Sequence, residues 1–178
     1  VLLWLTYRGL KPVSEITVER RNYSRLRKGI FKSSYDEKSP KIKRIRKWIR
    51  DADLSYAVEP KYPTSWHISK ELDKAVLSTK LLHQNDYESE CKSGMLFGFP
   101  EYSAKAYAQN QVKEDSVDVV WPGMMPSHPL LKDKYYLPYM FYAIRADRVK
   151  EDSLIAKQWA DTVRKEVPVL AGWHEKRL

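Results

Sequence analysis

The chain has 178 residues, a length that suits one well-cored domain and is marginal for two. Hydrophobic residues make up 43% of it, with only 6 glycines and 10 prolines, and this composition excludes a disordered chain. The single cysteine, Cys91, excludes an intramolecular disulfide and a thiolate metal cluster, and it favours a reducing, cytoplasmic location.

The formal net charge of +9 is concentrated in one part of the chain. Residues 19–50, here called the basic block, hold 13 lysines and arginines against three acids, and the other 146 residues together carry a net charge of −1. A concentrated positive field attracts polyanions in a way that a diffuse excess does not.

The beginning of the chain gives no sign of export or membrane insertion. Residues 1–5 are apolar but lack the preceding basic segment and the length of a signal-peptide core, so we expect no secretion signal. No apolar run approaches the roughly 20 residues that cross a bilayer, and we expect no transmembrane segment.

Residues 14–31 fit two local structures. Either a strand begins at residues 16–18, or Ile16, Tyr23, Leu26 and Ile30 share one face of a helix. The sequence leaves both alternatives open.

The clearest helix is predicted over residues 41–52. Ser39 is suited to cap it and Pro40 to take its first position. Apolar residues recur at steps of three and four and predict one buried stripe, formed by Ile42, Ile45, Trp48 and Ile49. Lysines and arginines cover the rest of the surface, so the pattern is that of a basic amphipathic helix.

Three further helices are predicted after it. The first is capped by Ser69 and carries Leu72, Ala75, Val76, Leu81 and Leu82. The second starts at Pro100, with Ala104, Tyr107 and Ala108 facing inward. The third covers residues 149–167 and ends near Pro168, with one face formed by Leu154, Ile155, Trp159, Thr162 and Val163.

The remaining segments complete the predicted fold. Gly94 and Gly98, four apart among bulky apolar residues, predict close backbone packing before a turn. Four prolines in residues 121–138 predict a long irregular segment, and residues 139–144 are the best strand candidate. We therefore predict an α+β fold, a single compact domain over residues 1–178, rich in helix and with a small sheet.

The basic block is the strongest functional signal. Its arginines can pair with phosphates, and interleaved aromatic residues can stack on bases, so we predict binding of RNA or DNA through a basic surface. The expected contacts are Arg20, Arg21, Arg25, Arg27, Lys28, Lys43, Arg44, Lys47 and Arg50. A merely solvated basic face, as in thermophilic proteins, is the main alternative, and an acidic protein partner or an anionic membrane surface ranks lower.

Metal and cysteine chemistry have little support in the sequence. The four histidines lie far apart and none belongs to a short metal-binding spacing, so we expect no metal site and no cofactor. Cys91 lacks the flanking motif of a cysteine nucleophile and is expected to be inert.

An enzyme acting on a small anionic substrate is the rival hypothesis. Its cleft would lie between the proline-rich segment and the turn at residues 98–101. The weak catalytic candidates are His128, Glu101 and His83, with Arg145 to bind the charge of the substrate.

The C-terminal half resembles an uncharacterised, mainly archaeal family of conserved proteins. The resemblance is carried by Gly98-Phe99-Pro100-Glu101, the helix after it, the Leu137-Pro138-Tyr139 segment and a tryptophan-containing helix. In that family cysteines often follow the Gly-Tyr-Pro-Glu turn, whereas Tyr102 and Ser103 stand here. The resemblance implies no activity.

Overall fold

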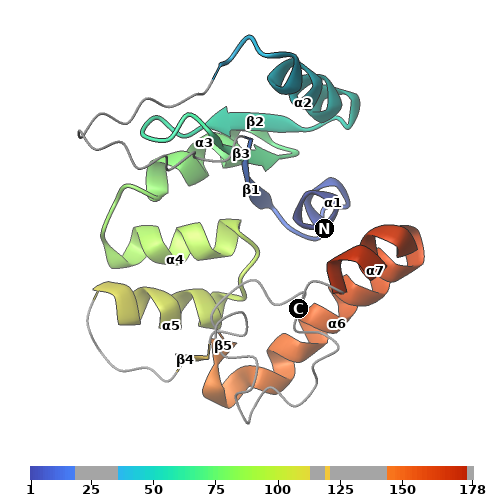
Figure 1. Cartoon of the computed structure of the whole chain (residues 1–178). Coiled ribbons are helices and arrows are strands. Elements are labelled where there is room, and N and C mark those ends of the chain that lie inside the picture. Colours follow the sequence, from blue (N-terminus) through green and yellow to red (C-terminus); the bar gives the residue numbers. More distant parts are fainter. Residues whose placement is uncertain (19–35, 113–118, 121–143, 176–178) are drawn as a thin grey trace, which may run out of the picture.

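The computed structural model describes residues 1–18, 36–112, 119–120 and 144–175, and these form the predicted α+β fold (Figure 1). In chain order the elements are α1 (Leu2–Tyr7), β1 (Val13–Thr17), α2 (Pro40–Asp51), β2 (Ser55–Val58), β3 (Ser65–Ser69), α3 (Leu72–Leu81), α4 (Tyr87–Leu96), α5 (Glu101–Val112), β4 (Val119–Val120), β5 (Ile144–Arg145), the 3-10 turn η2 (Ala146–Arg148), α6 (Val149–Glu166) and α7 (Pro168–Glu175). Among these residues no helix combines the length and the apolar content that a membrane span requires.

The first three strands form an antiparallel sheet in the order β1-β3-β2, which lies between α2 on one face and α3 on the other (Figure 1). All five residues of the central strand β3 are buried. Trp66 and Ile68 point to the α2 side, where they join its isoleucines in a core. Because side chains alternate along a strand, the polar residues Ser65, His67 and Ser69 point to the α3 side. The sheet therefore carries a buried polar face.

Helix α2 confirms the predicted start and most of the predicted stripe. The Ser39 side chain accepts a hydrogen bond from the Ile42 amide at 3.3 Å, and Pro40 occupies the first turn. Ile42 and Ile49 are fully buried. The prediction that Trp48 belongs to this stripe is wrong, because its side chain is 47% exposed. At 3.6 residues per turn, Trp48 lies about 100° or more around the helix from the buried Ile42 and Ile49, so it falls beside the stripe rather than within it.

Helices α3, α4 and α5 follow one another as layers below the sheet (Figure 1). Two details of the predicted α3 are wrong: Ser69 ends β3 and is not the N-cap, and Leu72 is exposed. The predicted close packing at the glycines is confirmed. A Cβ on Gly94 of α4 would lie 2.9 Å from the Cβ of Ala104 on α5, and Gly98 has φ of +82° in the turn between the helices.

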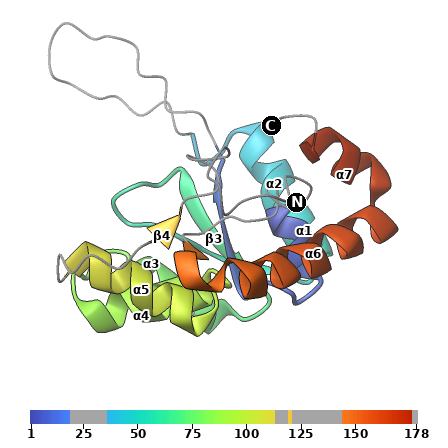
Figure 2. The same cartoon turned by 90° about the horizontal axis from the view of Figure 1, so that it is seen from below.

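A second core joins the two ends of the chain. Leu5 of α1 packs with buried residues of α6 and α7, among them Trp159 and Val163. Figure 2 shows α1 beside these two helices. Leu154 is 63% exposed, so its predicted place on the buried face is wrong. The predicted end of this helix near Pro168 is confirmed, since α6 ends at Glu166 and Pro168 starts α7.

A buried carboxylate ties α5 to α6. Asp152, in the first turn of α6, is fully buried and accepts hydrogen bonds from the Tyr102 hydroxyl at 3.0 Å and the Ser103 hydroxyl at 3.2 Å. Burial and this carboxylate raise the pKa of Tyr102. Tyr102 and Ser103 thus have a structural role.

Candidate functional site

The exposed half of α2 carries two rows of side chains. Lys43, Lys47 and Arg50 follow at steps of four and three, and all three are exposed. A second exposed row, with steps of three and four, consists of Lys41, Arg44 and Trp48. Residues at these spacings are neighbours on a helix surface. We call these six residues the basic face of α2.

Acidic residues neutralise little of this charge. Among the residues that the structure describes, the basic face has one ion pair, which joins Lys47 to Asp51 one turn along the helix. The sixth cation of the helix, Arg46, faces the sheet instead: it pairs with Glu37, and its guanidinium lies 5.5 Å from the centre of the Trp66 ring. The exposed half of α2 therefore keeps a strong positive charge.

Of the nine predicted nucleic-acid contacts, four lie on this face, namely Lys43, Arg44, Lys47 and Arg50. The other five lie outside the described residues, namely Arg20, Arg21, Arg25, Arg27 and Lys28. Lys41 was not among the predicted contacts, and Trp48 was considered for base stacking as one of the interleaved aromatic residues. The side chain of Trp48 was assigned to the core because its spacing from the isoleucines fits a buried stripe, and spacing alone does not give the width of that stripe.

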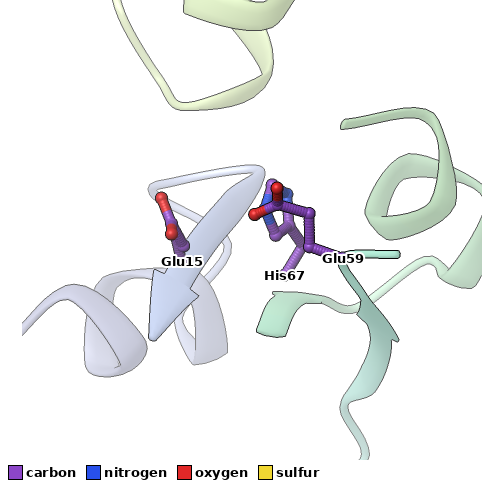
Figure 3. A group of neighbouring side chains, drawn as sticks. All are labelled: Glu15, Glu59 and His67. Carbon is purple, nitrogen blue, oxygen red and sulfur yellow. The ribbon is translucent and has the colours of Figure 1, made fainter. Parts of the chain in front are cut away.

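A second arrangement lies on the buried polar face of the sheet. Glu15 of β1 stands directly opposite His67 of β3, and Glu59 follows the last residue of β2. One ligand atom from each side chain lies within 4.8 Å of the others. Figure 3 shows the Glu15 side chain rising from β1 and the Glu59 carboxylate beside the His67 ring. We call them the Glu–His cluster.

Burial of this cluster disfavours the charged form of His67. His67 is fully buried and Glu59 is 5% exposed. Burial lowers the pKa of His67, the negative charge of Glu15 opposes this, and the neighbouring His83 adds to it. Beyond the cluster, the edge of the Phe97 ring meets His67 at a centroid distance of 5.6 Å.

The weak catalytic candidates from the sequence make other contacts. Glu101 pairs with Lys105 one turn along α5, and this lowers the pKa of Glu101. Arg145 pairs with Asp147, and His83 lies 3.4 Å from the Glu59 carboxylate. No hydrogen bond or ion pair joins Glu101, Arg145 and His83 to one another in the described part of the chain. His128 and the proline-rich segment lie outside it, so the enzyme hypothesis stays a prediction.

The Glu–His cluster escaped sequence analysis for a topological reason. Its members stand at positions 15, 59 and 67, with no local spacing that marks a site. Antiparallel pairing of β1 and β3 brings the first and last together. The alternation of polar and apolar residues in Ser65-Trp66-His67-Ile68-Ser69 was the available signal, since it is typical of a strand.

Comparisons with known proteins add no assignment: no family model matches the chain, and no curated protein or solved structure matches it either.

Proposed function

We propose that this protein binds RNA or DNA and that the basic face of α2 contacts the phosphate backbone. The observation that carries the proposal is the exposure of five cations and one tryptophan together on one half of a helix whose other half is anchored in the core. Packing of its isoleucines against the sheet fixes the backbone position of the helix, so only the side chains of the cations have to be ordered on binding.

The dimensions of the basic face suit a nucleic-acid strand. The row from Lys43 to Arg50 spans about 10 Å at the rise of an α-helix. That length equals about three base-pair rises along the axis of B-form DNA. Arg44 can pair with a phosphate through two parallel hydrogen bonds, whereas the lysines act as point charges.

Trp48 supports a preference for single strands. Its ring is 47% exposed, one turn from Arg44 and next to Lys47. An exposed indole forgoes the favourable free energy of hydrophobic burial. It offers a flat surface on which an unpaired base can stack. Bases in a duplex are already stacked on each other and present no free face to it.

Binding of this kind is driven by counterion release and depends little on the nucleotide sequence. The test is fluorescence anisotropy of the full chain with random-sequence single- and double-stranded oligonucleotides across a salt series. A variant with Lys43→Ala, Lys47→Ala and Arg50→Ala is expected to bind at least about tenfold more weakly, since each lost phosphate contact removes its share of the counterion term.

The matched control removes the same number of charges elsewhere. Lys150, Lys157 and Lys165 are exposed on α6, and their replacement by alanine is expected to leave the affinity within about twofold at moderate salt. Absence of binding at low salt, or an equal loss in both triple variants, contradicts the proposal.

A further inference from the structure

We propose that the Glu–His cluster binds one divalent transition-metal ion of the Zn²⁺ class, through His67 Nε2 and the carboxylates of Glu15 and Glu59. The site is independent of the basic face, because it lies on the other face of the sheet from α2. Three observations carry it: the tautomer of His67, its unpaired nitrogen and the two carboxylates.

The hydrogen bonds of Ser78 determine where His67 carries its proton. The Ser78 hydroxyl donates its single hydrogen to the Ala75 carbonyl, with an oxygen–oxygen distance of 2.8 Å. Its oxygen lies 2.7 Å from His67 Nδ1 and so has to accept the other bond. Neutral His67 therefore carries its hydrogen on Nδ1 and a free lone pair on Nε2. A metal-binding histidine is commonly oriented in this way, with its second nitrogen donating to a neighbour.

The free nitrogen lies where water is excluded. His67 is fully buried, and its Nε2 has no hydrogen-bond partner in the described structure. A buried polar atom without a partner costs about 1–3 kcal/mol. A metal ion bonded to this lone pair would remove that cost, and this would explain why a buried nitrogen is left without a hydrogen-bond partner.

The two carboxylates supply the matching charge. Glu15 is held by the Ser65 hydroxyl, which donates to its Oε1 at 2.5 Å, and Glu59 is almost completely buried. Two carboxylates and a neutral imidazole balance the charge of a divalent cation. Mixed nitrogen and oxygen donors of this kind suit Zn²⁺ better than Mg²⁺, which prefers oxygen alone.

The ligand atoms would have to move slightly closer together to bind a metal ion. Ligand atoms of tetrahedral Zn²⁺ lie about 3.3 Å apart, and here they lie within 4.8 Å of one another. Glu15 is an exposed residue and has the freedom to move inward. His83 Nε2 lies 3.4 Å from Glu59 Oε1, but His83 is not one of the residues whose ligand atoms all lie within 4.8 Å of one another, so the fourth position is left to water.

The experiment measures Zn²⁺ binding to the full chain after treatment with a chelator. Competition with a chromophoric chelator is expected to give one Zn²⁺ per chain, and Co²⁺ is expected to give the visible absorption bands of a tetrahedral site. Glu15→Gln and Glu59→Gln should each weaken Zn²⁺ by about tenfold or more, and Ser78→Ala by about 10- to 100-fold through loss of the His67 orientation. His67→Gln should abolish the site.

If a variant of a buried residue fails to fold, Glu15→Gln still tests the proposal. Its side chain is exposed, and the glutamine oxygen can still accept the hydrogen bond from the Ser65 hydroxyl, so this variant is expected to fold. Glu88→Gln, an exposed carboxylate on α4, and Cys91→Ser are the controls and should bind Zn²⁺ as the wild type does. The proposal is overturned if the wild type shows no equimolar site, if Glu15→Gln leaves the affinity unchanged, or if Cys91→Ser removes binding.

Discussion

A buried ammonium group makes the stability of this protein dependent on pH in the alkaline range. Lys11 is 4% exposed, and it donates a hydrogen bond to the Phe97 carbonyl. Burial lowers its pKa from 10.5 to about 8. Between these two values the unfolded chain holds a proton on Lys11 that the folded chain has lost, so the free energy of unfolding rises with pH.

The size of the effect follows from the shift. Each pKa unit is worth about 1.4 kcal/mol, so Lys11 contributes about 2 kcal/mol of added stability between about pH 7 and pH 9.5. Above about pH 10 the phenol groups of Tyr102 and Tyr107, whose pKa values burial raises, act in the opposite direction. Measurements therefore stop below that point.

The assay is urea denaturation of the wild type and of Lys11→Met at several pH values. Methionine keeps the apolar stem that packs against Gly98 and removes the ammonium group. The difference in unfolding free energy between the two proteins should shift by about 2 kcal/mol over this range. Parallel pH profiles for the two proteins would refute the reasoning, because they would mean that Lys11 titrates in the same way in both states.

Four further predictions concern packing and binding. Gly94→Ala should lower the free energy of unfolding by about 1–2 kcal/mol in urea, because the new Cβ meets Ala104 at 2.9 Å. Gly172→Ala in α7, with nothing within 4 Å of its new Cβ, should instead raise it by up to about 1 kcal/mol. Asp152→Asn should destabilise by about 1–3 kcal/mol in the same assay, because an amide has one oxygen for the two hydroxyls that the carboxylate accepts. Trp48→Ala should weaken single-stranded oligonucleotides by about 1–3 kcal/mol in anisotropy and change stability little, since the ring is half exposed.

The helices with strong local signals were predictable from the sequence. In α2, the cap at Ser39, the proline after it and the isoleucine spacing all specify one helix, and the structure confirms its bounds to within a residue or two. The start of α5 after Pro100 and the length of α6 were predicted in the same way. Local rules suffice where cap, period and end signal agree.

Strand β1 overlaps the strand alternative at residues 16–18, and Ile144 of β5 lies in the strand candidate of residues 139–144, but β2, β3 and α4 carried no comparable local signal. The buried positions of helix α4 are Ser89, Cys91, Ser93 and Gly94, because the helix packs through small residues, and they do not form the apolar stripe that marks a helix in a sequence. Strand β3 buries polar side chains on one face, and the hydrophobic pattern therefore understates its burial. The Glu–His cluster depends on strand pairing between distant residues, which no local pattern encodes.

The salt dependence of oligonucleotide binding tests the central claim most directly. Plotted as log affinity against log salt for single strands, the wild type should be steeper than the Lys43, Lys47 and Arg50 triple variant by about 2, because each lost phosphate contact removes about 0.7 from the slope. Equal slopes for the two proteins would mean that α2 makes no phosphate contacts, and the proposed role of its basic face would then be abandoned.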